Sequence, residues 1–161
     1  MPQTIAAIFA LGAAVLLAFN MQQASVKTQM DLVHEEVTSF ASSVALDVLG
    51  HIGAQDFDSA TRGATVTDPA NLSSTPFSTG NRYENADDID DFHRMQTYTF
   101  ISDYDGMPFD VDVTVDYVDE ADGTTVVAGP TFAKLVTVTV SNDLLRERDV
   151  DIVLSQVYTY P

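Results

Sequence analysis

Apolar residues dominate the first third of the chain in two successive patterns. From Ile5 to Phe19 every residue is apolar or glycine. Further on, apolar residues recur at steps of three and four, which is the spacing of one face of an α-helix. No proline follows Pro2 before Gly53, and glycine is typical of a helix end. We therefore expect one long helix over about residues 3–53.

The first part of this helix, residues 1–26, is apolar on all sides. A helix with such a surface has to be buried on all sides. Small residues alternate with the large ones, and this permits close approach of neighbouring helices. The residues that we expect to form an assembly core are Ile5, Ile8, Phe9, Leu11, Gly12, Val15, Leu16 and Phe19.

Three interpretations compete for residues 1–26. A secretory signal peptide needs a basic first region, which the opening Met-Pro-Gln-Thr lacks. A transmembrane anchor needs about 18–20 apolar residues and flanking Lys or Arg, and the strictly apolar run is shorter than that. The third interpretation is a helix that crosses the bilayer briefly and then packs against copies of itself. The mixture of small and large apolar residues favours this third interpretation.

The second part of the helix, residues 27–53, is amphipathic. Its apolar stripe is wide enough to cover one face of a β-sheet. The residues that we expect to pack on that sheet are Met30, Val33, Val37, Phe40, Val44 and Ile52.

The last part of the chain, residues 96–161, has the alternation of β-strands. Residues 109–118 alternate strictly between apolar and polar residues, and residues 132–141 alternate again. Further strands are expected at 96–102 and 150–158, with a short one at 124–128 and a hairpin turn at Asp122-Gly123. Short connections favour an antiparallel meander of four or five strands. The predicted fold class is α+β, with the amphipathic half-helix covering the sheet.

The intervening segment, residues 54–95, is rich in Ser, Thr, Asp, Asn, Pro and Gly and is expected to form a long surface loop. Phe57, Leu72 and Phe77 are its candidates for attachment to the core. Asn71 begins an Asn-Leu-Ser triplet, which is an N-glycosylation acceptor pattern that also arises by chance.

An acidic cluster closes this segment and consists of Asp87, Asp88, Asp90 and Asp91. Three outcomes are open for it: solvation in salt, pairing with Arg82 and Arg94, or a bound Ca²⁺, which takes six to eight oxygen ligands. The spacing does not match an EF-hand loop. The neighbouring apolar residues are expected to face the core.

The formal charge of the chain is −17 and the chain has no cysteine. Such an acidic surface repels nucleic acid, and this argues against nucleic acid as a partner. Nothing in the sequence supplies a nucleophile elbow, a metal triad or a phosphate loop, so we expect no enzymatic activity and, calcium apart, no cofactor. Stability has to come from the core or from assembly, since disulfides are excluded.

The apolar run, the amphipathic half-helix that continues it and the β-rich end together resemble a mature type IV pilin or a type IV pilin-like filament subunit. The resemblance covers residues 1–53 by pattern and the remainder by architecture. It implies removal of a leader by a prepilin peptidase, passage through the cytoplasmic membrane, and handling by a pilus assembly machinery. Most such pilins have a glutamate at the fifth mature position, where this chain has Ile5, so subunit register would come from packing if Met1 is the mature start.

The function expected from this resemblance is that of a structural subunit in an extracellular, cell-surface filament, with other copies of the chain as its partners. Contacts that repeat without closing give an open helical polymer. The alternative is a membrane-anchored pseudopilin or minor pilin-like binding module that forms no long filament.

Overall fold

The structure is a computed structural model, and it describes residues 2–95, 98–101, 106–146 and 150–161. The chain divides into two compact units, residues 1–37 and 38–161. The first element, helix α1 (Pro2–Gly53), contributes to both units. The prediction of one uninterrupted helix over the first third of the chain is confirmed.

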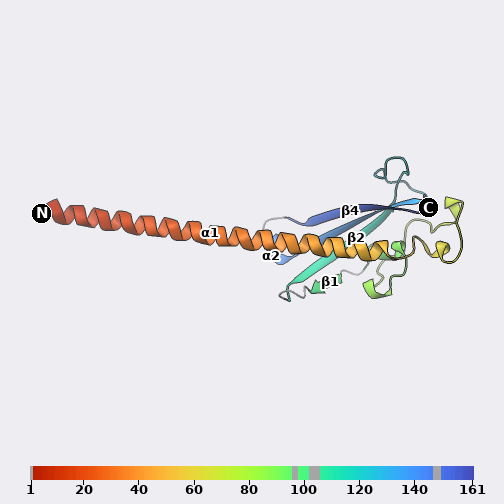
Figure 1. The fold of residues 1–161 in the computed structure, drawn as a ribbon, viewed down its shortest axis with the longest axis horizontal. Coiled ribbons are helices and arrows are strands. Elements are labelled where there is room, and N and C mark those ends of the chain that lie inside the picture. The colour runs from red at the N-terminus through yellow and green to blue at the C-terminus, as the bar shows by residue number, and fades with distance from the viewer. Residues whose placement is uncertain (1, 96–97, 102–105, 147–149) are drawn as a thin grey trace. The chain divides into compact units, whose positions relative to one another are not determined.

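The C-terminal unit contains a four-stranded antiparallel sheet (Figure 1). Its strands lie in chain order, which makes it a meander, and the predicted α+β fold class is confirmed. The strands are β1 (Tyr98–Ile101), β2 (Pro108–Tyr117), β3 (Ala133–Ser141) and β4 (Ile152–Thr159).

Two details of the sheet differ from the prediction. Residues 124–128 form no strand, because their pairing is limited to a single bridge between Val118 and Val126. The link between β3 and β4 contains a short helix, α2 (Asp143–Arg146), where a polar connection was expected. The predicted turn is confirmed, since Gly123 has a positive φ of 67° that favours glycine.

One face of the sheet is buried, and the strand register defines it. Valines pair across β2 and β3 on this face: Val111 with Val140, Val113 with Val138, and Val115 with Val136. Each of these six side chains is buried. The next pair on the same face joins Tyr117 to Lys134, so a lysine takes a position in the apolar layer.

The C-terminal part of α1 packs on the sheet (Figure 1). Its buried stripe includes Ala41, Ala45 and Val48 beside the predicted Val44 and Ile52. The hydroxyl group of Tyr158 on β4 donates a hydrogen bond of 2.6 Å to the carbonyl oxygen of Leu49. A Cβ atom added at Gly53 would lie 2.6 Å from the Tyr158 ring, so this close approach requires glycine.

The other predicted packing residues divide into two groups. Val37 is buried and Phe40 is half-buried. Met30 and Val33 belong to the N-terminal unit and are 61% and 50% exposed. The buried stripe in the chain therefore begins at Val37.

Residues 54–95 form four short 3₁₀ helices joined by turns. These are η1 (Ser59–Thr61), η2 (Pro69–Asn71), η3 (Tyr83–Asn85) and η4 (Ile89–Phe92). Phe57, Leu72 and Phe77 are buried, as predicted, and so are Ile89 and Phe92. The segment is therefore attached to the core at several points along its length.

Candidate functional site

The first candidate site is the apolar surface of the N-terminal unit. No described side chain between Ala6 and Val33 is buried in the chain. Phe9 is 76% exposed and Val15 is 62% exposed, and Ile8, Leu11, Leu16 and Phe19 are exposed to a similar degree. The side chain of Ile5, which we also expected in the assembly core, lies outside the described residues. An apolar surface of this extent marks an interaction site or a membrane contact.

The same surface contains small residues at regular intervals. Ala10, Ala14 and Ala18 follow one another at steps of four and therefore share one helix face. Gly12 is a further small residue on this helix. A Cβ atom added there would meet nothing within 4 Å, so packing inside the chain does not require this glycine. By length and composition, α1 is also apolar enough to cross a membrane.

The second candidate site is a charged cluster inside the C-terminal unit. The Lys134 side chain is fully buried. Its ammonium group donates hydrogen bonds to the carboxylates of Asp90 and Asp58, the latter at 3.4 Å, and to the carbonyl oxygen of Phe57 at 2.6 Å. A lysine is almost never fully buried unless it is paired, and these two carboxylates supply the pairing.

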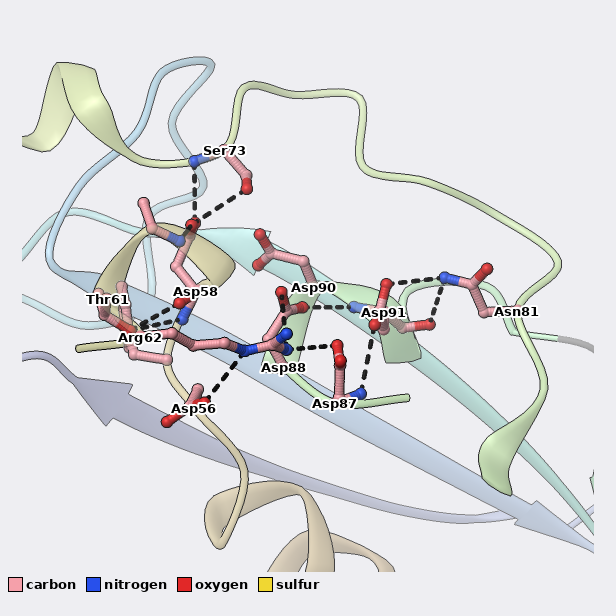
Figure 2. Close-up of polar contacts among 12 residues, drawn as sticks. Asp56, Asp58, Thr61, Arg62, Ser73, Asn81, Asp87, Asp88, Asp90 and Asp91 are labelled. Carbon is pink, nitrogen blue, oxygen red and sulfur yellow. Dashed lines mark hydrogen bonds and ion pairs between the residues drawn. The ribbon is translucent and has the colours of Figure 1, made fainter. Parts of the chain in front are cut away.

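Asp58 is fixed by several donors and is fully buried. It is the N-cap of η1, where it accepts a hydrogen bond of 2.9 Å from the backbone N–H of Ala60. It also accepts 2.8 Å and 3.2 Å bonds from the N–H and hydroxyl groups of Ser73 (Figure 2). Burial raises the pKa of Asp58, but these backbone donors and the charge of Lys134 together hold it below its ordinary value.

The carboxyl group of Asp90 has fewer hydrogen-bond partners than that of Asp58, and its pKa is shifted in the opposite direction. Its Oδ1 atom contacts Lys134, whereas its Oδ2 atom is buried with no hydrogen-bond partner among the described residues. Burial raises the pKa of Asp90 to about 7, although the charge of Lys134 and its hydrogen bond oppose the shift. Two buried carboxyl groups on one ammonium group therefore have pKa values displaced in opposite directions.

Three aromatic rings surround the Lys134 ammonium group. The ring centroids of Phe57, Tyr117 and Phe77 lie 4.3, 5.1 and 5.5 Å from its nitrogen atom. The hydroxyl group of Tyr117 donates to the carbonyl oxygen of Ser73 at 2.9 Å. The rings exclude water from the cluster and favour the cation through their faces.

Next to this interior cluster lies the predicted acidic cluster, with Arg62 as its ion-pair partner (Figure 2). The Arg62 guanidinium group contacts Asp87 and lies 3.1 Å from Asp56 and 3.9 Å from Asp88. The hydrogen bond from Arg62 lowers the pKa of Asp87. Arg62 thus differs from the two arginines, Arg82 and Arg94, that we considered as ion-pair partners in one of the three open outcomes.

The acids of this cluster also cap the local backbone. Asp88 is the N-cap of η4 and accepts from the N–H of Asp91 at 3.1 Å. Asp91 accepts from the Asn81 amide at 2.9 Å. Oxygen atoms of Asp87, Asp88 and Asp91 lie within 4.8 Å of one another, a group that does not include Asp90. In Figure 2 the Asp90 carboxyl group points away from Asp91.

A calcium ion at the predicted cluster of Asp87, Asp88, Asp90 and Asp91 stays a prediction, and three of these residues, all but Asp90, lie close enough together to share an ion. Arg62 already supplies positive charge to this cluster, and that geometry favours the ion-pair interpretation. Glycosylation of Asn71 also stays a prediction. Its side chain is exposed, while Ser73 of the same triplet binds Asp58.

The sequence analysis did not single out Lys134, Asp58 or Ser73. A signal for Lys134 was present, because Lys134 shares the parity of the buried Val136, Val138 and Val140 along its strand. A charged residue on the apolar side of an alternating strand predicts a buried partner of opposite charge. That partner lies 76 residues away in the case of Asp58, and such a separation has no local pattern.

The α+β fold has a pilin-like architecture, in which a long apolar N-terminal helix packs on an antiparallel sheet. Comparisons with known protein families, with curated proteins and with solved structures give no match to this chain.

Proposed function

We propose that this chain is a pilin-like structural subunit of an extracellular helical filament, assembled through the N-terminal part of α1. The observation that supports the proposal is the exposed apolar surface from Ile8 to Phe19. Burying one large apolar side chain is worth roughly 1.5–3 kcal/mol, so a surface with this many of them favours association strongly. Copies of the same helix offer a cover of matching chemistry.

The small residues determine how closely neighbouring helices can approach in the proposed filament. Helices approach closely where Gly and Ala line the contact, and the face formed by Ala10, Ala14 and Ala18 provides such a line. Contacts between different faces of identical helices produce an open filament when the rotation between copies does not close into a ring. The net charge of −17 keeps the surface soluble and hinders nonspecific association.

The first test is whether the host cell carries filaments that contain this chain. Material sheared from cells is examined by negative-stain electron microscopy and mass spectrometry. We expect fibres that contain the chain. Recovery of the chain from the membrane fraction alone, with no fibres, would contradict the proposal and favour a membrane-anchored module.

A matched pair of variants tests the role of the helix. Val15→Asp places a charge on the proposed assembly surface, whereas Val126→Asp makes the same change at a residue of similar exposure, 58% against 62%. We expect Val15→Asp to abolish filaments and Val126→Asp to retain them. Equal loss in both variants would argue against a specific role of α1.

Gly12→Leu separates a packed filament from a single membrane anchor. Within the chain a side chain at Gly12 meets nothing, and leucine is fully compatible with lipid. A close-packed helix bundle has no room for it. We expect the variant to insert into membranes and to form few or no filaments, whereas normal filaments would contradict close packing at Gly12.

A further inference from the structure

The interior of the C-terminal unit brings a primary amine and a carboxyl group into direct contact. The Lys134 nitrogen atom pairs with Asp90, and their side chains are 0% and 9% exposed. Lys134 lies on β3 and Asp90 lies on η4, and the two residues are 44 positions apart along the chain. An ion pair in such a place is expensive, because both charges have lost their hydration.

The surroundings keep water away from both groups. Phe57, Phe77 and Tyr117 place aromatic rings around the amine, as described above. Burial raises the pKa of Asp90, so its carboxylic acid form is accessible near neutral pH. Oδ2 of Asp90 has no hydrogen-bond partner among the described residues, so the protein does little to hold this oxygen atom as an anion.

A second carboxyl group lies within reach of the same amine. Asp58 Oδ2 is 3.4 Å from the Lys134 nitrogen atom, and both side chains are fully buried. Backbone donors from Ala60 and Ser73 stabilise the ionised form of Asp58. The cluster therefore holds an amine, an acid and a base in one water-excluding site, which is the set that acyl transfer requires.

We propose that Lys134 and Asp90 condense into an intramolecular amide bond, and that Asp58 transfers the proton. The ammonium group of Lys134 first gives a proton to the Asp90 carboxylate across their contact. The amine then attacks Cγ of Asp90 and forms the C–N bond. Asp58 takes a proton from the nitrogen atom and gives it to the departing oxygen atom, which leaves as water when the C–O bond breaks. One amide and one water replace an ammonium and a carboxylate, so atoms and charge balance.

The site provides two conditions for amide formation that are missing in water: fixed contact between the amine and the carboxyl group, and exclusion of water. Fixing the two groups in contact replaces a bimolecular encounter, which is the origin of large effective concentrations in folded proteins. Exclusion of water disfavours the reverse hydrolysis. The product also removes the buried Lys134–Asp90 charge pair, whose desolvation is costly.

The bond would serve as a covalent brace in a chain that has no cysteine. It would tie η4, and with it the end of the 54–95 segment, to β3, one of the two inner strands of the sheet. A cross-link between distant residues stabilises a fold by restricting the unfolded chain, as a disulfide does. This inference does not depend on filament assembly, since every group involved lies in residues 38–161.

The decisive measurement is the intact mass of the full chain, purified in detergent and then denatured. We expect a mass lower than that of the sequence by one water molecule, and a branched peptide that joins Lys134 to Asp90 after proteolysis. A folded protein with the full sequence mass would overturn the proposal.

The chain provides an internal control, because Lys27 and Lys134 are its only lysines. An amine-acylating reagent is applied under denaturing conditions, where a simple ion pair is disrupted. We expect complete labelling of Lys27 and none of Lys134. Labelling of both lysines would overturn the proposal independently of the intact mass.

The Asp58→Asn variant tests the proton-transfer group and keeps both residues that would be linked. We expect it to keep the full sequence mass and to allow labelling of Lys134. Loss of water in this variant would overturn the role of Asp58. Circular dichroism of the same samples verifies that the variant is folded, and Lys134→Arg, which retains the charge but cannot form the amide, is the unlinked reference.

Discussion

Each of the two units of this protein departs from the usual distribution of polarity in its own way. In the N-terminal unit, Phe9 and Val15 are apolar and exposed, whereas in the C-terminal unit Lys134 and Asp58 are charged and fully buried. Each arrangement is costly for an isolated chain, because apolar surface in water and charge in a dry interior are both unfavourable. The comparison shows that the two unfavourable arrangements are relieved in different ways. Other chains can cover the exposed apolar surface, whereas only groups within the fold can compensate the buried charges.

The largest expected effect comes from the same truncation made in both units. Phe92→Ala removes a fully buried ring and should lower the unfolding free energy of the C-terminal unit by about 3–5 kcal/mol. Phe9→Ala removes an exposed ring, so it should change this quantity by less than about 0.5 kcal/mol. Denaturant unfolding of the full chain in detergent measures both, and similar effects of the two variants would contradict the contrast between the units.

Substitutions of Lys134 and Lys27 compare a buried lysine with an exposed one. Lys134→Met leaves Asp58 and Asp90 without the lysine that contacts both of them and should destabilise the protein by about 3–5 kcal/mol. Lys27→Met alters an exposed residue, and about 0.5 kcal/mol or less is expected. The same unfolding experiment applies. If Lys134→Met were as stable as the parent protein, the buried cluster would have no structural role.

A smaller effect is expected from two glycines at the end of α1. Gly53→Ala forces the Tyr158 ring to move and should cost about 1–3 kcal/mol. Gly50→Ala meets nothing within 4 Å and should stabilise the helix by up to about 1 kcal/mol. Thermal unfolding compares the two, and a stabilised Gly53→Ala variant would show that the contact between α1 and β4 is loose.

The smallest effect concerns the exposed turn between β2 and β3. The hydroxyl group of Thr125 and the N–H groups of Thr125 and Thr124 hold the pKa of Asp122 at about 2. A lowered pKa means that the ionised form is favoured in the folded state. This contribution is complete above the ordinary value of 3.8 and is lost as the pH falls through about 2.

An NMR titration of the Asp122 carboxyl group measures this shift directly. Thr125→Val removes one of its donors, at 2.6 Å, and should move the pKa upward, toward the ordinary value. A pKa near 3.8 in the parent protein would show that the turn does not hold this carboxylate.

Periodic parts of the fold could be predicted from the sequence. The helix was recognisable because apolar spacing and the lack of proline act over many residues, and β2 was recognisable from strict alternation. Residues 124–128 contain β-forming residues, but their pairing is limited to one bridge, between Val126 and Val118. Local propensity alone does not determine pairing.

The contacts between charged residues could not be predicted in the same way. Arg62, rather than the nearby Arg82 or Arg94, pairs with the acidic cluster, because the fold brings η1 beside η4. The parallel bridge between Asp56 and Asp88 brings the two segments together, and no sequence pattern predicts this bridge. Parity along β3 was the one available clue to the burial of Lys134.

The central claim is that sister chains cover the N-terminal part of α1, and the lack of native cysteine permits a direct measurement. Ala14→Cys introduces a single thiol on the small-residue face, and oxidation is carried out on intact cells. We predict disulfide-linked dimers in the sheared surface fraction, and monomers when the filaments are dissolved in detergent before oxidation. Monomers in both cases would contradict the account.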